Sequence, residues 1–249
     1  MEVLIWVIGL IVGSFLNVCI YRIPRKESIV IGPSHCTKCN TKLKVYDLVP
    51  IFSFLFLRGK CRYCGEKISF RYPSVELLNS LLFLLCYLHY GPVAHVIPKM
   101  ILCSVLVVIS FIDLDTQEIP NGAVLLIIGL GVLNILLDSS LKWTESLIGF
   151  FAVSIPMLLI AMVSKGGMGG GDIKLMAAAG LFLGWKNVLT AFFIACLIAG
   201  VLGMILILLK KRERKDKIPF GPFLAIGILI SMLYGQEIIH RYLQFAGIL

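Results

Sequence analysis

Charged side chains are scarce in this sequence, and the marks of a repeat protein or an exported soluble protein are missing. Only 15% of its 249 residues are charged, whereas an ordinary soluble domain has roughly 25%. There is no repeat of the solenoid type and no low-complexity tract. The first apolar segment follows Met1-Glu2 without a basic start, and no small-residue cleavage site precedes Arg22. We therefore expect this segment to stay in the protein as a helix and not to be removed as a signal peptide.

Apolar residues fill the chain instead. They make up 59% of it, and the mean hydropathy is +0.95, so water cannot be its main solvent. Eight apolar segments, each near the length that crosses a bilayer, recur from one end to the other. They cover residues 3–21, 73–90, 93–112, 119–137, 143–163, 173–184, 188–209 and 218–234. The sequence thus predicts an all-α polytopic membrane protein with about eight transmembrane helices and membrane lipid as a partner.

Positive charges are unevenly distributed among the loops that join these segments. Segment 173–184 is short enough to be re-entrant, and the charges test whether it crosses. If all eight segments cross and the N-terminus lies outside, 19 of the 23 Lys and Arg residues fall in the cytoplasmic loops 22–71, 165–174 and 210–217. Membrane proteins carry such an excess on the cytoplasmic side. We expect this orientation, and because it accounts for the net charge of +9, we expect no nucleic-acid binding.

One loop is large enough to form a soluble piece. The chain accordingly divides into a first transmembrane helix (1–21), a cytoplasmic loop (22–72) and a transmembrane core (73–249). Four of the eight cysteines lie in the loop as two C-x-x-C pairs, Cys36 with Cys39 and Cys61 with Cys64. Four thiolates are the ligand set of a tetrahedral structural zinc site, with no position left for a catalytic water. We predict zinc bound by these four residues.

The alternatives for the Cys pairs are two disulfides or a redox motif. A loop in the reducing cytoplasm seldom holds disulfides, and no strand–helix pattern of a redox domain surrounds either pair. Gly65 follows the second pair, where a tight turn can point backbone amides at sulfur. His35 is a spare candidate ligand.

Acidic residues near membrane segments are costly and suggest a function. Asp113 lies where segment 93–112 meets the cytoplasm, and Asp172 ends the glycine-rich run 166–171 and opens segment 173–184. The predicted topology places both on the cytoplasmic side at similar depth. Two neighbouring carboxylates cannot both ionise cheaply, so one keeps a proton while the other acts as a base, which is the state that an aspartic protease needs. We expect the glycines to let a substrate backbone approach and to adopt angles closed to other residues.

Other acidic residues nearby have ordinary explanations. Asp115 lies about 200° around a helix from Asp113, so only one of the two can face a partner helix, and chemistry alone does not choose between them. Glu118 is a candidate for a solvated helix-end residue. Glu76 could pair with Arg71 or Lys67, or simply sit at the positive end of a helix dipole.

Several short segments occur in a characteristic order. They are residues 12–18, the two Cys pairs, residues 71–76, residues 112–120 and residues 169–175. Together they resemble the type IV prepilin peptidase family, whose G-x-G-D signature corresponds to Gly169-Gly170-Gly171-Asp172. The resemblance implies an intramembrane aspartic protease of the prokaryotic cytoplasmic (inner) membrane, with Asp113 and Asp172 as the catalytic pair. Its partner would be a prepilin or pseudopilin substrate, whose leader peptide it removes.

The resemblance also implies a second activity. Family members with the four-Cys loop go on to N-methylate the new N-terminal residue with S-adenosylmethionine. The methyl-donor site cannot be located from the sequence, which has no glycine-rich nucleotide fingerprint; Glu76 and Asn17 are guesses. Three alternatives stay open: a peptidase without methylation, an ion-coupled transporter with Asp113 and Asp172 as a proton relay, and a zinc-binding membrane adaptor without chemistry. The oligomeric state is not predicted.

Overall fold

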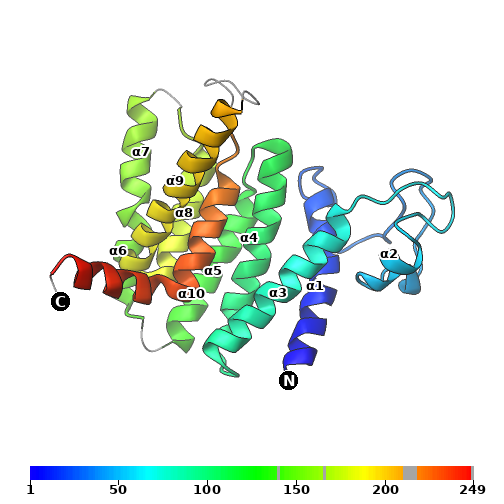
Figure 1. Ribbon diagram of the computed structural model, residues 1–249, viewed down its shortest axis with the longest axis horizontal. Helices are drawn as coiled ribbons and strands as arrows, with labels where there is room; N and C mark the ends of the chain where they lie inside the picture. Colours follow the sequence, from blue (N-terminus) through cyan, green and yellow to red (C-terminus); the bar gives the residue numbers. More distant parts are fainter. Residues whose placement is uncertain (139–140, 165–166, 210–217, 248–249) are drawn as a thin grey trace. The chain divides into compact units, whose positions relative to one another are not determined.

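The computed structural model describes residues 1–138, 141–164, 167–209 and 218–247, and within them the fold is all-helical (Figure 1). The only β-structure in this part of the chain is two isolated bridges. The chain forms two compact units, Met1–Val108 and Ile109–Leu249, with the division inside one helix. The helices are α1 (Glu2–Arg22), α2 (Phe52–Phe56), α3 (Arg71–Tyr90), α4 (Val96–Thr116), α5 (Asn121–Leu137), α6 (Trp143–Ala152), α7 (Ser154–Val163), α8 (Gly170–Leu183), α9 (Trp185–Leu208) and α10 (Gly221–Phe245).

Each of the eight predicted segments corresponds to helix in the structure, which confirms an all-helical protein. Five helical stretches in the described residues are long and apolar enough to cross a membrane: α1, α4, α6 with α7, α9 and α10. Helix α5 is a shorter apolar helix, and α8 has only 14 residues. The count of eight crossings therefore stays a prediction, as does the orientation, and the basic loop 210–217 lies outside the described residues.

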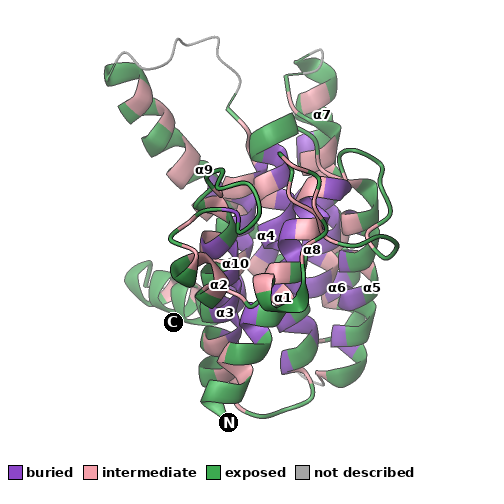
Figure 2. Ribbon diagram, turned by 90° about the vertical axis from the view of Figure 1, so that its right-hand side faces the viewer, coloured by how far each residue is buried: buried purple, intermediate pink, exposed green. Residues whose placement is uncertain are grey.

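Large apolar side chains are exposed on several helices. Only 11% of the most apolar window of α9 is buried inside the protein, and its exposed residues are large hydrophobics such as Phe193 and Leu197 (Figure 2). A soluble monomer rarely exposes apolar surface on this scale, whereas a bilayer covers it at no cost. Several such helices fit a multi-pass membrane protein.

In the Met1–Val108 unit, α1 packs along α3 (Figure 1). The two backbones approach closely because Gly9 and Gly13 of α1 present no side chain where α3 passes. Asn79 of α3 donates to the carbonyl oxygen of Gly9 (2.8 Å) and accepts a hydrogen bond from Ser104 of α4 (2.8 Å). These buried polar bonds fix the register of α3 between its neighbours.

Helix α8 is the centre of the Ile109–Leu249 unit. It packs against α5, α6, α7, α9 and α10, and most of its residues are buried (Figure 2). The helix ends at Gly184, whose φ of 79° and ψ of 167° are readily adopted only by glycine. Helix α9 begins directly afterwards at Trp185. The short α8 is therefore set by a glycine turn and not by a shortage of apolar residues.

The predicted segment 143–163 is a helix in two parts. Helix α6 ends at Ala152 and α7 begins at Ser154. Pro156 explains the break, because proline has no N–H to give to the carbonyl of Ala152 and its ring crowds that oxygen. The hydroxyl of Ser154 donates to the carbonyl oxygen of Phe150, one turn earlier, a side-chain bond that often accompanies a bend in a helix.

Helices α6 and α8 cross at a contact between two glycines. A Cβ atom on Gly180 would collide with the backbone of Gly149, and the reverse is also true. We expect Gly180→Ala to lower the free energy of unfolding by about 1–3 kcal/mol, because the helices would have to separate. Denaturant unfolding in detergent measures this. Gly129→Ala in α5 is the matched control, since a Cβ there meets nothing within 4 Å, and an equal loss in both variants would contradict the explanation.

Candidate active site and metal centre

Asp113 is a buried carboxylate in the last turn of α4. Only 5% of its surface is exposed, whereas Asp115 and Glu118 are exposed. The sequence predicted that Asp113 and Asp115 would face different directions, and the structure confirms it. Burial selects Asp113 as the residue that faces the other helices of its unit.

The start of α10 holds the Asp113 carboxylate. The backbone N–H of Gly221 donates to Oδ2 of Asp113 (2.8 Å), and a Cβ on Gly221 would come within 2.7 Å of the same oxygen. Only glycine leaves room for the carboxylate here. The sequence interpretation missed Gly221, although Pro222 beside it marks the first turn of a helix and so the place where free N–H groups occur.

Asp172 lies in the first turn of α8 and is half-buried. Its carboxylate is close enough to Asp113 for the two charges to repel each other. Each carboxylate also lies at a helix N-terminus, Asp172 at α8 and Asp113 at α10, where the helix dipole favours negative charge. The structure therefore brings the two aspartates together within the Ile109–Leu249 unit.

The glycines before Asp172 matter for space and not for backbone angles. No positive φ occurs among residues 167 and 169–171, so the expectation of angles closed to other residues is wrong there; Gly166 lies outside the described residues. A Cβ on Gly169 would come within 2.9 Å of Oδ2 of Asp172, whereas one on Gly170 would meet nothing. Gly169 thus leaves room for a carboxylate, as Gly221 does.

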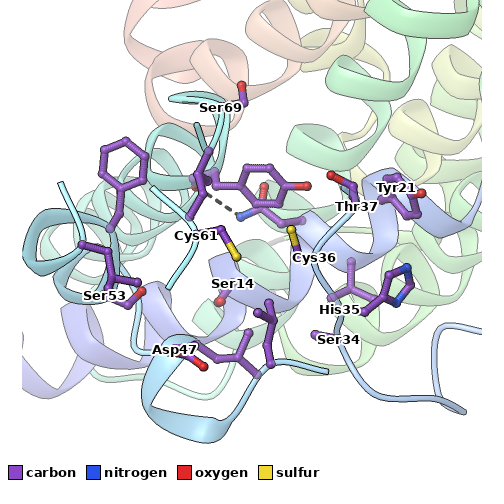
Figure 3. Close-up of a pocket in the computed structure, with 18 of the residues that line it drawn as sticks. Ser14, Tyr21, Ser34, His35, Cys36, Thr37, Asp47, Ser53, Cys61 and Ser69 are labelled. Carbon is purple, nitrogen blue, oxygen red and sulfur yellow. Dashed lines mark hydrogen bonds between the residues drawn. The ribbon is translucent and has the colours of Figure 1, made fainter. Parts of the chain in front are cut away.

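The structure gathers the four loop cysteines at one point. Their Sγ atoms all lie within 4.8 Å of one another, and Cys36 and Cys64 are 4.0 Å apart. Figure 3 shows two of the four, Cys36 and Cys61. A tetrahedral zinc with Zn–S bonds of about 2.3 Å needs sulfurs about 3.8 Å apart. The four thiols therefore fit a zinc ion, and the cysteines are free, not paired in disulfides. Within the described residues, His35 is not part of this cluster.

The two Cys pairs are built on the same turn. The N–H of Asn40 donates to the carbonyl oxygen of Cys36 (2.9 Å), and that of Gly65 donates to the carbonyl oxygen of Cys61 (2.9 Å). The residue that follows each pair has a positive φ, 55° at Asn40 and 72° at Gly65. Asparagine and glycine are the residues that tolerate this conformation. The tight turn predicted at Gly65 is confirmed, and Asn40 is its counterpart.

Cys39 is disposed to act as a metal ligand. A hydrogen bond joins its Sγ to the hydroxyl of Thr41 (3.3 Å) and lowers the pKa of Cys39 to about 6. Since the thiolate is the form that binds metal, this residue is ready to do so near neutral pH.

Asp47 fastens the spacer between the Cys pairs to the second pair. Its carboxylate accepts hydrogen bonds from Arg62 Nε (2.7 Å) and from the Tyr63 hydroxyl (2.8 Å), and its side chain is 3% exposed. Arg62 and Tyr63 lie between Cys61 and Cys64, so Asp47 closes the 21-residue spacer onto the four-Cys cluster. The spacing of the cysteines did not predict this role of Asp47.

Arg22 fastens the other end of the loop to α1. Its buried guanidinium donates to four carbonyl oxygens of the following segment, which are those of Ser28, Ile31, Gly32 and Pro33. Five donors in a planar fork suit this multiple contact. The loop is thus held both at α1, through Arg22, and at the second Cys pair, through Asp47.

A cavity of about 640 Å³ lies between this loop and the ends of α1 and α3 (Figure 3). Asn17 and Glu76 both line it and are buried. Glu76 accepts the N–H of Ile51 (2.7 Å) and interacts with Ser14. Neither Arg71 nor Lys67 is among these partners of Glu76, so the suggested pairing stays a prediction.

Comparison with known proteins covers both units. Residues 7–90 match the Bacterial Peptidase A24 N-terminal domain, and residues 100–204 match the Type IV leader peptidase family. No solved structure matches the chain.

Relatives named "Prepilin leader peptidase/N-methyltransferase" match almost from end to end. One from Bacillus subtilis (strain 168) is 35% identical, covering 98% of this chain and 98% of its own. Those from Xanthomonas campestris and Pseudomonas aeruginosa are 34% and 33% identical, covering 97% and 96% of this chain and 94% and 92% of their own. The resemblance found in the sequence is thereby confirmed, and the chain belongs to the type IV leader peptidase family.

Proposed function

We propose that this protein is an intramembrane aspartic peptidase that removes the leader peptide of type IV prepilins or related pseudopilins. The observation that carries the proposal is the meeting of Asp113 and Asp172 within charge–charge range, with glycines against both carboxylates. The names of the relatives supply the substrate class. We further propose that the pair faces the cytoplasm, because the predicted topology places the basic loops on that side.

The chemistry follows from two carboxyl groups that share one proton. The ionised carboxylate takes a proton from water, whose oxygen attacks the carbonyl carbon of the scissile bond while the other carboxyl group protonates the carbonyl oxygen. As the C–N bond breaks, the newly protonated carboxyl group gives its proton to the leaving amine. A hydroxyl group of the tetrahedral intermediate gives its proton to the other carboxylate as the new carboxyl group forms, so the pair returns to its starting state. Gly221 and Gly169 leave the space in which the carboxylates can turn toward the peptide.

We also propose that the protein N-methylates the amine that cleavage exposes. The support is the name that the relatives share, together with a cavity beside the four-Cys loop that the peptidase chemistry does not use. Zinc on Cys36, Cys39, Cys61 and Cys64 would supply a structural cross-link and S-adenosylmethionine an electrophilic methyl group. The chain's own part is to hold the loop against α1 through Arg22 and against the second Cys pair through Asp47.

Mass spectrometry of a processed substrate tests both activities at once. Purified protein in lipid is incubated with a prepilin and S-adenosylmethionine, and we expect a new N-terminus that carries one methyl group. An intact substrate would contradict the peptidase, and proton-coupled uptake by vesicles holding the protein would favour a transporter.

Gly221→Ala is expected to lower the cleavage rate roughly tenfold or more, since the added methyl group displaces the Asp113 carboxylate and small misplacements of reacting groups are costly. The assay is the initial rate of leader removal, with folding checked by thermal unfolding. Gly170→Ala is the matched control, because its Cβ meets nothing although it lies beside the other aspartate. An unchanged cleavage rate in Gly221→Ala would contradict the proposal that Gly221 leaves the space that the Asp113 carboxylate needs.

A further inference from the structure

We infer that the cavity of the Met1–Val108 unit is the binding site of the methyl donor, a cationic sulfonium nucleoside, and that Glu76 recognises its positive charge. The inference rests on the proposed methyltransferase activity and gives that activity a location. The walls of this cavity come from the two Cys pairs, the spacer between them and the facing ends of α1 and α3 (Figure 3).

The size of the cavity suits a nucleoside. Its volume of about 640 Å³ lies in the range of roughly 300–1,000 Å³ that small-molecule sites occupy. The lining includes the aromatic rings of Tyr21, Phe54 and Tyr72. Flat rings stack on a purine base, and their faces also attract a cation.

Glu76 gives the cavity a preference for positive charge. Its surface is 8% exposed, and it has no cationic partner among the residues that the structure describes. A buried carboxylate without a counter-ion is costly to maintain. A ligand cation in the cavity would offset this cost, whereas a neutral ligand of the same shape would not.

The backbone around Glu76 is held in a strained form. Ile51 donates its N–H to the carboxylate and has a φ of 59°, which is rare for a β-branched residue. Such strain persists where the surroundings enforce it, and it gathers at ligand sites. Glu76 thus fixes the start of α2, which forms one wall of the cavity that Glu76 itself lines.

Of the four Lys and Arg residues that line the cavity, the two arginines are already engaged. Arg22 is bound to four carbonyl oxygens, and Arg62 is paired with Asp47. Lys38 and Lys67 also line the cavity, where ammonium groups suit the carboxylate of an amino-acid moiety. A sulfonium joined to a nucleoside and an amino acid meets all three kinds of lining, aromatic, acidic and basic.

Transfer of the methyl group from the sulfonium to the amine conserves atoms, electrons and charge. The lone pair of the substrate's neutral amine forms a bond to the methyl carbon, the C–S bond breaks, and its electron pair stays on sulfur. The sulfonium becomes a neutral thioether, and the methylated amine releases one proton to water. Glu76 thereby loses its attraction for the product, which favours exchange for fresh donor.

Binding measurements on the full-length protein in nanodiscs test the role of Glu76. S-adenosylmethionine and S-adenosylhomocysteine differ by the methyl group and its charge, and their Kd values are measured by equilibrium dialysis. We expect Glu76→Gln to raise the Kd of S-adenosylmethionine roughly tenfold or more and to change that of S-adenosylhomocysteine little. Glutamine can still accept the N–H of Ile51, so the fold of this wall is kept. Equal effects on both ligands would overturn recognition of charge.

A second variant tests the cavity itself. Ser53 of α2 lines it, and Ser53→Trp should fill it and abolish binding of both nucleosides. Leu55→Trp in the same helix is the matched control, because Leu55 is 63% exposed and does not line the cavity. Unchanged affinity in Ser53→Trp would overturn the location.

The outcomes separate this inference from the proposed function. A wild-type protein that methylates its substrate, with donor affinity unaffected by both Glu76→Gln and Ser53→Trp, would overturn the site and leave the activity standing. A wild-type protein that cleaves but neither methylates nor binds S-adenosylmethionine would overturn both the methyltransferase and its site.

Discussion

Asp113→Asn is expected to abolish leader removal, lowering the rate by roughly 100- to 10,000-fold, the range that one positioned acid or base contributes. An amide keeps the shape of the carboxylate and can still accept the N–H of Gly221, so the helix ends should stay in place. It cannot share or move a proton. Asp172→Asn should have the same effect for the same reason. The measurement is the initial rate on a prepilin, with correct insertion verified by detergent extraction and thermal unfolding.

Asp115→Asn is the matched control for this experiment. It is the same substitution two residues further along α4, at an exposed position. We expect a mild effect at most. A normal cleavage rate in Asp113→Asn, or an equal loss of cleavage in Asp115→Asn, would contradict the assignment of the catalytic pair.

Loss of zinc should separate the two proposed activities. We expect one tightly bound zinc per chain, measured by elemental analysis, and its loss in Cys36→Ser, because three thiolates no longer complete the tetrahedral set. The loop would then lose the cross-link between its two Cys pairs, and the cavity that they help to line would open. Methylation should fall first, while some cleavage remains because Asp113 and Asp172 belong to the Ile109–Leu249 unit.

Two controls make the zinc experiment decisive. Cys196→Ser removes an exposed thiol in α9 that lies outside the cluster, and it should keep the metal and both activities. Asp172→Asn should still methylate a substrate that is supplied already cleaved. Equal loss of cleavage and methylation in a folded, inserted Cys36→Ser protein would contradict separable sites, and a zinc-free wild type would contradict the metal centre.

The sequence predicted those features that depend on local pattern. Apolar segments located the helices, because a membrane helix satisfies its own backbone hydrogen bonds and needs only length and hydrophobicity. C-x-x-C spacing located the four-thiol cluster, since each pair is a single turn of chain. The position of Asp113 followed from its place at the end of an apolar segment. Chemistry alone did not choose it over Asp115; the family resemblance did, and the burial of Asp113 agrees with that choice.

The features that the sequence did not predict depend on tertiary contact. Gly221 matters because α10 begins beside Asp113, 108 residues away along the chain. Asp47 is an ordinary loop acid until the spacer folds back onto Arg62. The cavity arises only when the loop closes over α1 and α3. In each case the signal is a distance between remote residues, which no local pattern contains.

The way in which Arg22 holds the loop affects how this region can evolve. Its four acceptors are backbone carbonyls, which every residue type offers, so the side chains of residues 28–33 can change without weakening the anchor. Gly32 is the exception, because its φ of 106° favours glycine. Lysine could not replace Arg22, since a single ammonium cannot reach four oxygens in this arrangement. Relatives can therefore diversify this surface toward different partners while one arginine keeps the loop in place.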